Sequence, residues 1–377
     1  MHRTIHRRAG ALALATLLAG ASALVPTSPA SASIAGEAVF FASPNSNQVV
    51  VLAGGERTSV TAYPVTQVLA GHFTSTTGAQ AFLYNPGSGP DGLLDVVRDG
   101  DGLATTLTSM PVGGTFQPFV ADLDLDGRDD IFWYAPGAAK DYIWFFEGDG
   151  SVTSQAVSVN GRFQPVPVTV DGINAQPDHQ GIVWYAPGAA PDRWWMFTGR
   201  TFSSEPLSIS GRYQPVVGEF WKRNYGTSAD QILFYDPLGG RNWLWTFHRG
   251  DGAHRSDPIA ASPGAGFTPV VTQAGMHGAD YVYWYGPGSR QERIWRFDGS
   301  GKVVDNVFPP INRTSRVLRD PQGRSAAEEV VFLGEGTSAS TYQLAPEHAP
   351  VFGTVTNING LPRAPRAAST WFENPVE

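Results

Sequence analysis

A short stretch with acidic residues at alternate positions is the part of the sequence whose residue types and spacing can do chemistry. Residues 122–130 read Asp-Leu-Asp-Leu-Asp-Gly-Arg-Asp-Asp. Carboxylates at positions one, three, five and nine of a tight loop converge on a hard cation that prefers oxygen ligands. Gly127 permits a sharp turn, and the backbone carbonyl of Arg128 would add one more oxygen. The predicted ion is therefore Ca²⁺, and its predicted ligands are Asp122, Asp124, Asp126, Arg128 and Asp130.

The surroundings of this loop distinguish it from a helical calcium-binding hand. An EF-hand loop carries a bidentate Glu at position twelve, where this chain has Trp133. The other repeats of the chain, described next, lack the acidic pattern, so we expect one structural site. The alternative is an Asp- and Gly-rich turn that binds no ion. We prefer the metal site because crowded carboxylates repel one another unless a cation neutralises them.

The acidic loop leads into one of seven related aromatic segments. Phe-Trp-Tyr-Ala-Pro-Gly at residues 132–137 recurs as Val-Trp-Tyr-Ala-Pro-Gly at 183–188 and as Tyr-Trp-Tyr-Gly-Pro-Gly at 283–288. Looser copies complete the set, and the third residues of the seven copies are 41, 84, 134, 185, 235, 285 and 333. A unit of about fifty residues that recurs at a nearly constant period is typical of a propeller or another repeat architecture.

Each complete repeat contains four strand-like parts. The first begins with Phe-Gln-Pro or a close variant, and the aromatic segment follows it. A Trp-rich segment comes third, and a Gly-rich tight turn separates it from the fourth. Four short strands per repeat predict an all-β fold, namely a seven-bladed β-propeller of four-stranded blades. Most tryptophans fall on the second and third strands, and we expect them to form the core between blades.

The two ends of the chain are predicted to complete one blade together. The mature N-terminus begins directly at an aromatic segment, so the first blade lacks its first strand. Asn357–Gly360 resembles the end of a fourth strand, which leaves Arg363–Glu373 as a spare segment. We expect this C-terminal segment to pair with the N-terminal blade, because closing the ring removes exposed strand edges.

Residues 1–32 have the composition of a secretory signal peptide. Arginines precede an apolar run at 11–24, and an Ala-x-Ala cleavage site ends at Ala32. The adjacent Arg7 and Arg8 leave open whether export follows the general or the twin-arginine route. The apolar run is too short for a membrane span, and no comparable run follows it. We therefore expect a secreted, extracellular bacterial protein without a membrane anchor, in which residues 33–377 form the propeller.

Charge and composition exclude several classes of function. The chain has 34 acidic and 26 basic residues, a formal net charge of −8 and no basic run. Nucleic acids and anionic lipids are not expected as partners, because both need clustered Lys and Arg. There is no cysteine, which excludes disulfides and thiol chemistry. The chain lacks a Gly-x-Ser-x-Gly motif, and its mature part lacks histidines at metal-ligand spacing, so we expect no catalytic residues.

The loop at 122–130 and the Ile-Phe-Trp-Tyr strand after it resemble the FG-GAP, or VCBS-type, repeat of the propeller in integrin α-subunits. The chain looks most like the secreted bacterial proteins of that class, and the repeats cover nearly all of its mature part. The resemblance implies a seven-bladed propeller, calcium in blade loops and recognition of extracellular ligands. The chain departs from the family by keeping one intact acidic loop and by beginning its repeats with Phe-Gln-Pro in place of Phe-Gly.

These features favour a secreted, non-catalytic binding protein. The abundance of aromatic residues, 12 % of the chain, and the lectins among similar propellers favour an extracellular glycan as the ligand. One alternative is a scaffold that binds partner proteins at one face of the ring. Another is an enzyme that acts on polysaccharides, such as a glycoside hydrolase or lyase, because paired carboxylates can be distant in the chain.

Overall fold

The computed structural model describes most of the chain between Ala38 and Ser369. The described residues are 38–53, 56–74, 78–99, 102–170, 179–221, 230–247, 254–273, 279–298, 300–311, 316–320, 328–333, 339–344, 353–358, 361 and 366–369. The predicted signal peptide at 1–32 lies outside them. Every regular element in this described part is a β-strand, as the turn-rich sequence predicted.

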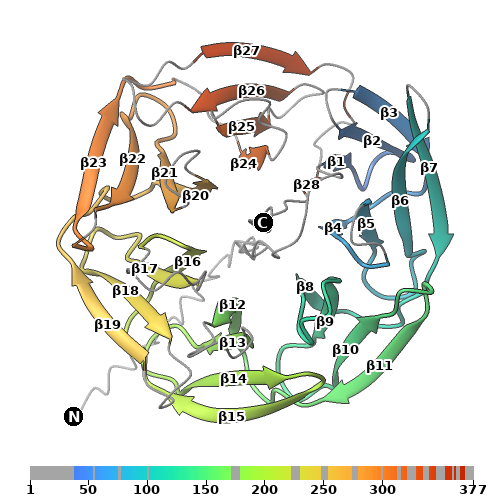
Figure 1. Ribbon diagram of the computed structural model, residues 1–377, viewed down its shortest axis with the longest axis horizontal. Coiled ribbons are helices and arrows are strands. Elements are labelled where there is room, and N and C mark those ends of the chain that lie inside the picture. The colour runs from blue at the N-terminus through green and yellow to red at the C-terminus, as the bar shows by residue number, and fades with distance from the viewer. Residues whose placement is uncertain are drawn as a thin grey trace, which may run out of the picture.

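The strands are short and follow one another at regular intervals (Figure 1). In chain order they are β1 (Ala38–Ala42), β2 (Gln48–Ala53), β3 (Glu56–Thr61), β4 (Gln67–Gly71), β5 (Ala79–Tyr84), β6 (Gly92–Asp99), β7 (Gly102–Ser109), β8 (Gln117–Ala121), β9 (Asp130–Tyr134), β10 (Asp141–Phe146), β11 (Val152–Val157), β12 (Gln164–Val170), β13 (His179–Tyr185), β14 (Asp192–Thr198), β15 (Thr201–Leu207), β16 (Gln214–Gly218), β17 (Gln231–Tyr235), β18 (Asn242–Phe247), β19 (His254–Ile259), β20 (Thr268–Gln273), β21 (Asp280–Tyr285), β22 (Glu292–Phe297), β23 (Val303–Phe308), β24 (Arg316–Asp320), β25 (Glu328–Leu333), β26 (Ala339–Leu344), β27 (Gly353–Ile358) and β28 (Arg366–Ser369).

The described strands form seven four-stranded sheets, whose paired strands are all antiparallel. Sheet 1 has the order β28-β1-β2-β3, and sheets 2 to 7 each take the next four consecutive strands, from β4–β7 to β24–β27. The sheets stand around a central axis, with β4, β8, β12, β16, β20 and β24 innermost and the fourth strands on the outer wall (Figure 1). Each predicted aromatic segment is the second strand of its sheet. The arrangement is that of a propeller-like ring.

Sheet 1 joins the two ends of the described chain. β28 pairs antiparallel with β1, with Val39 opposite Ser369 and Ala42 opposite Arg366. It also lies against β4 and β24, the first strands of the sheets on either side. The C-terminal segment therefore supplies the strand that the N-terminal repeat lacks, in agreement with the sequence, because a four-stranded sheet can be completed from either end of the chain.

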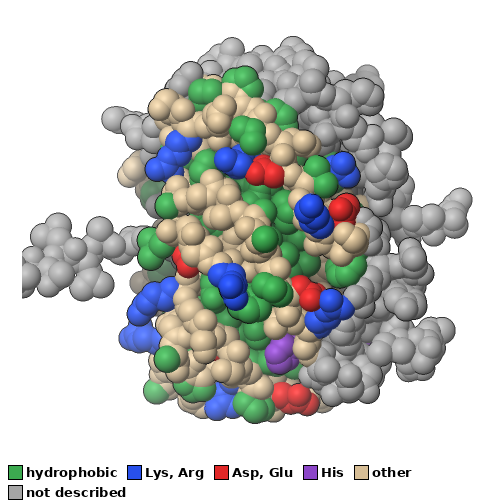
Figure 2. Space-filling view, turned by 90° about the vertical axis from the view of Figure 1, so that its left-hand side faces the viewer, with side chains coloured by type: hydrophobic (Ala, Val, Ile, Leu, Met, Phe, Trp, Pro, Cys, Tyr) green, Lys and Arg blue, Asp and Glu red, His purple; other side chains and the backbone are tan. Residues whose placement is uncertain are grey.

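Burial falls from the inside of the ring to the outside. The second strands β5, β9, β17 and β21 are buried at every position, because a sheet that packs on both faces needs apolar residues in succession. The outer strand β3 instead alternates between partly buried and exposed residues. On the side of the outer wall that Figure 2 presents, basic, acidic and apolar side chains are interspersed. Among the described residues on this side, no single kind of side chain covers a large area.

Aromatic side chains from neighbouring sheets form the core between them, as the sequence predicted. Trp184 on β13 is fully buried, and its ring centroid lies 5.2 Å from that of Phe132 and 5.2 Å from that of Tyr134, both on β9. Trp195 on β14 packs on the same ring at 5.2 Å. Trp184 therefore fills the space between sheets 3 and 4 and is not available to a ligand.

In sheets 3 and 4, a buried acid at the start of the third strand accepts hydrogen bonds from the backbone that follows the second strand and from the backbone that follows the fourth strand. Asp141 accepts hydrogen bonds from the backbone N–H groups of Ala135, at 2.7 Å, and Val159, at 2.8 Å. Asp192 makes the same two contacts in sheet 4, with Ala186 at 2.7 Å and Ile209 at 2.6 Å. These acids belong to the repeating framework, because their carboxylates accept hydrogen bonds from backbone N–H groups that would otherwise be buried without partners.

Candidate metal centre

The acidic loop connects two paired strands of sheet 3. β8 ends at Ala121 opposite Asp130, the first residue of β9, so the loop must turn back within a few residues. Leu123 is 1 % exposed and anchors the loop in the core between sheets 3 and 4. The backbone is left-handed at Leu125, with φ 58°, and at Gly127, with φ 85°. Glycine adopts this conformation readily, which explains the glycine at position six.

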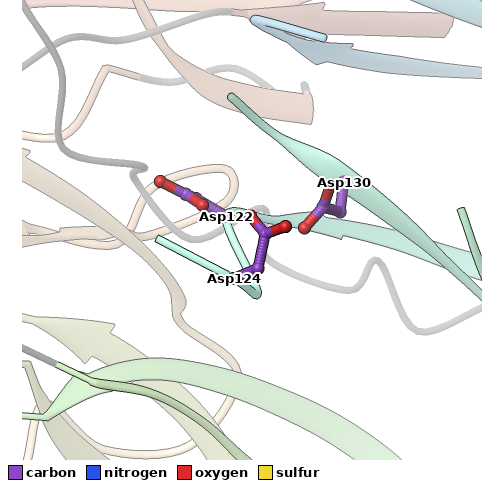
Figure 3. A group of neighbouring side chains, drawn as sticks. All are labelled: Asp122, Asp124 and Asp130. Carbon is purple, nitrogen blue, oxygen red and sulfur yellow. The ribbon is translucent and has the colours of Figure 1, made fainter. Parts of the chain in front are cut away.

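Three of the predicted ligands come together at this turn. Asp122, Asp124 and Asp130 each direct one carboxylate oxygen into a group whose atoms all lie within 4.8 Å of one another (Figure 3). We call these three residues the carboxylate cluster. An arrangement of oxygen donors at this spacing suits a hard cation such as Ca²⁺.

Backbone N–H groups hold two members of the carboxylate cluster in place. Asp122 accepts from Asp126 at 3.1 Å and from Gly127 at 2.9 Å, each oxygen taking one bond. Asp130 accepts from Leu123 at 2.9 Å and from Phe146 at 3.3 Å. These bonds fix the carboxylates but leave lone pairs free, because each oxygen can accept more than one contact.

Asp124 carries the observation that points most directly to a ligand. Its side chain is 7 % exposed, and its Oδ2 accepts a hydrogen bond from Arg200 at 2.7 Å. Its Oδ1 is buried and has no hydrogen-bond partner among the described residues. A buried carboxylate oxygen without a partner is costly, and a bound cation would satisfy it.

The other two predicted ligands, Asp126 and Arg128, are engaged with each other. The Asp126 carboxylate forms an ion pair with the Arg128 guanidinium and accepts from the Arg128 backbone N–H at 2.9 Å. Arg128 Nε also donates to the carbonyl of Phe146 at 3.1 Å. Asp126 is therefore outside the carboxylate cluster in this conformation. The alternation of acids in the sequence could not reveal this, because it does not show where the Arg128 side chain turns.

Burial and mutual repulsion disturb the ionisation of the carboxylate cluster. Burial, followed by the negative charges of Asp129, Asp126 and Asp124, raises the pKa of Asp122 to about 7. Burial, followed by the charges of Asp124 and Asp122, raises the pKa of Asp130 to about 9. The charged forms are disfavoured because burial removes water from the carboxylates and because like charges lie close together, and a divalent ion would reverse this effect.

Asp129, which the sequence left without a role, connects sheet 3 to sheet 2. Its carboxylate accepts from the backbone N–H of His72 at 2.8 Å, and its own N–H donates to the His72 carbonyl at 2.8 Å. Asp280 makes the same pair of contacts with Glu219, at 2.8 Å each. The repetition of this contact in another sheet identifies Asp129 as part of the framework.

Arg200 is the residue at the site that sequence reasoning missed. It lies on the turn between β14 and β15 of sheet 4, 76 positions after Asp124, and donates to Asp124 across the boundary between sheets. It also donates to Glu147 Oε1 at 2.6 Å. No local motif surrounds Arg200 in the sequence, so only the packing of the two sheets reveals the contact.

A second feature of the described surface is a cleft of about 230 Å³ between sheets 4 and 5. Its lining residues are Ser208, Ile209, Ser210, Tyr213, Trp243, Trp245 and Ser256. This lining includes no carboxylate and no imidazole.

Comparisons with known proteins identify the architecture but no family. No protein-family model matches the sequence, and no curated protein matches it. Among solved structures, a protein from Lactobacillus plantarum is 9 % identical with a TM-score of 0.54, over 89 % of this chain and 99 % of that one. A putative 6-phosphogluconolactonase from Bacteroides uniformis is 12 % identical with a TM-score of 0.54, over 89 % and 100 %. Apo AztD from Citrobacter koseri is 10 % identical with a TM-score of 0.51, over 88 % and 98 %.

These similarities correct one expectation from the sequence. We expected a non-catalytic binding protein, for a glycan or for a partner protein. One of these three similar structures, however, the putative 6-phosphogluconolactonase, bears the name of an enzyme. The propeller-like ring is thus compatible with catalysis, and the preference for a non-catalytic role was wrong. At such identities the likeness concerns the fold alone. Among the described residues, no helix has the length and apolar character that crossing a bilayer requires.

Proposed function

We propose that this protein is an exported, calcium-binding β-propeller in which loop 122–130 holds one Ca²⁺ ion. The observation that carries the proposal is the carboxylate cluster, in which one oxygen each of Asp122, Asp124 and Asp130 lies within 4.8 Å of the others. The buried Asp124 Oδ1, which has no partner among the described residues, supports it independently. The resemblance of the loop and its following strand to the FG-GAP repeat supports the same ion.

The donor chemistry favours calcium over softer metals. All donors of the cluster are carboxylate oxygens, and Ca²⁺ accepts six to eight oxygen ligands in flexible geometry, whereas zinc and copper prefer sulfur and imidazole. Water molecules and the backbone carbonyl of Arg128 would complete the shell. Asp126 would join it only by leaving Arg128, to which its carboxylate is bound.

The bound ion would act as a structural link. It would join the end of β8 to the start of β9 through Asp122, Asp124 and Asp130. It would also offset the repulsion and burial that raise the pKa values of Asp122 and Asp130. Asp124 also accepts a hydrogen bond from Arg200 of sheet 4, so the ion would bind beside the boundary between sheets 3 and 4.

Calcium should raise the melting temperature of the wild type, and Asp124→Ala should abolish the rise. A ligand present at a hundred times its dissociation constant stabilises the folded state by about 2.7 kcal/mol, which is several degrees for a chain of this size. The measurement is thermal unfolding, followed by circular dichroism, in a chelator and in CaCl₂ at about a hundred times the dissociation constant.

Asp149→Ala is the matched control for that experiment. Asp149 lies in the hairpin after β10 and forms a hydrogen bond with the backbone N–H of Ser151, outside the carboxylate cluster. This variant should keep the full calcium response. A wild-type melting temperature that does not change between chelator and calcium would refute the metal site.

Export would bring the site to an environment rich in calcium. The proposal therefore includes cleavage after Ala32, and the protein recovered from the culture medium should begin at Ser33. Intact-mass spectrometry and N-terminal sequencing of the secreted protein measure this directly. Recovery of the chain only from the cell interior, with residues 1–32 still attached, would contradict export.

A further inference from the structure

Arg200 places a positive charge of sheet 4 against the acidic loop of sheet 3. It follows Gly199 on the short turn that pairs Thr198 of β14 with Thr201 of β15. Its Nε donates to Asp124 Oδ2 at 2.7 Å, and its Nη1 donates to Glu147 Oε1 at 2.6 Å. The guanidinium thus bridges the carboxylate cluster and the residue that follows β10.

The position of this guanidinium is well defined. Its central carbon lies 4.9 Å from the centroid of the Phe145 ring, a distance suited to a cation–π contact. The Arg200 side chain is 35 % exposed, so it is partly withdrawn from solvent while it holds both acids. An arginine stays charged at every accessible pH, so the cluster always has this cation beside it.

Asp124 is therefore shared between two sites. Its Oδ2 accepts a hydrogen bond from Arg200, whereas its Oδ1 is buried and has no partner among the described residues. Figure 3 shows this carboxylate beside those of Asp122 and Asp130. A calcium ion held by the cluster and the guanidinium would lie on the same carboxylate. Like charges at such a separation repel, and they do so more strongly where water is partly excluded.

We propose that Arg200 is a built-in counter-charge that weakens calcium binding at loop 122–130. This inference rests on the proposed calcium site and adds its regulation. Arg200 partly neutralises the cluster when no ion is bound, so the loop does not depend on the ion to keep its shape. When an ion binds, the same charge opposes it. The site then fills at the roughly millimolar calcium concentrations typical of extracellular modules and empties below them.

The experiment measures the calcium dissociation constants of Arg200 and Glu147 variants by titration calorimetry after the protein has been freed of metal. Arg200→Gln, which removes the charge, should bind calcium about tenfold more tightly than the wild type. Arg200→Lys, which keeps it, should bind as the wild type does. Glu147→Gln removes a negative charge and leaves Arg200 to Asp124 alone, so it should weaken binding about threefold.

Two further measurements separate charge from structure. The difference between Arg200→Gln and the wild type should shrink at high salt, because added ions screen charge repulsion but not the loss of a positioning contact. Arg255→Gln is the matched control, because Arg255 pairs with Asp257 on β19, away from the acidic loop. It should leave the dissociation constant unchanged. If Arg200→Gln does not fold, the opposite shift in Glu147→Gln carries the test.

The outcomes distinguish this inference from the proposed function. If the wild type shows no calcium binding, both the proposed calcium site and the proposed role of Arg200 are refuted. A wild type that binds calcium, with Arg200→Gln equal or weaker in affinity, leaves the calcium site intact and overturns the role of Arg200 as an opposing charge. In that case Arg200 would instead be a residue that positions Asp124 for the ion.

Discussion

A chain that ends at residue 362 should lose at least about 3 kcal/mol of stability and unfold without a single sharp transition, because it lacks β28. The four residues of β28 pair with Val39, Phe40, Phe41 and Ala42 of β1. Each backbone hydrogen bond that is lost contributes about 1 kcal/mol, and an unpaired buried N–H or C=O costs more. All five residues of β1 are buried, so its opened edge would have to rearrange to reach water.

The loss should extend beyond one pair of strands. β28 also lies against β4 and β24, and its removal would separate sheet 1 from the last sheet of the ring. An open edge strand is in addition a template for pairing with other chains, so we expect aggregation on heating. Calorimetry and light scattering during a thermal ramp measure both effects.

The matched control for the truncation is a chain that ends at Ser369 and therefore keeps β28. It should melt close to the full-length protein. If the chain that ends at residue 362 melts as cooperatively as this control and at the same temperature, closure of the ring by the C-terminal strand does not contribute to stability.

The metal-free protein should become less stable as the pH rises from about 6.5 to about 9. Asp122 and Asp130 have pKa values raised to about 7 and about 9, against about 4 in the unfolded chain. Between these values the unfolded chain releases protons that the folded protein retains, so a higher pH favours unfolding. Their stabilising contribution is complete below pH 4 and is lost as the pH passes through the folded values. The loss amounts to a few kcal/mol.

A buried histidine acts in the opposite direction below about pH 6.5. Burial lowers the pKa of His72 to about 3, so the folded protein keeps it neutral while the unfolded chain binds a proton below about pH 6.5. Acid therefore destabilises the protein through His72. Above pH 6.5 this effect is absent, and the carboxylate cluster determines the slope.

Asp130→Asn isolates the contribution of the cluster. Asparagine cannot ionise, so the stability of this variant in chelator should depend less on pH between 6.5 and 9. Asp130 accepts bonds from Leu123 and Phe146, and an amide can accept only one of them through its oxygen, so the variant loses a constant amount of stability. The test is therefore the slope against pH in urea unfolding, not the absolute value.

Calcium should reverse the dependence of stability on pH in the wild type but not in Asp130→Asn. The ion binds the ionised carboxylates, so its stabilising effect grows with pH, and Asp130→Asn should lack this growth. Parallel pH profiles of the wild type and Asp130→Asn in chelator would show that Asp130 is ionised in both the folded and the unfolded protein, and would contradict this account of the cluster.

The sequence alone determined the architecture because the relevant signals are local and repeated. The aromatic segments at 132–137 and 183–188 became β9 and β13, whose neighbouring positions are buried on both faces. A spare segment near the C-terminus and a missing strand near the N-terminus were enough to predict β28 beside β1. The three residues of the carboxylate cluster were also predicted, because they lie within nine residues of one loop.

Only the tertiary structure decided which groups act on that loop. In the folded chain Asp126 pairs with Arg128, and Arg200 donates a hydrogen bond to Asp124. Asp129 accepts a hydrogen bond from the backbone of His72. These contacts depend on side-chain direction and on the packing of sheets whose residues are 57 to 76 positions apart in the chain. Alternating residue types encode which face of a strand is buried, but they do not encode which charge of a neighbouring sheet faces a given loop. For the same reason the ring could be predicted from the repeats, whereas the preference for a non-catalytic role could not be sustained from the fold.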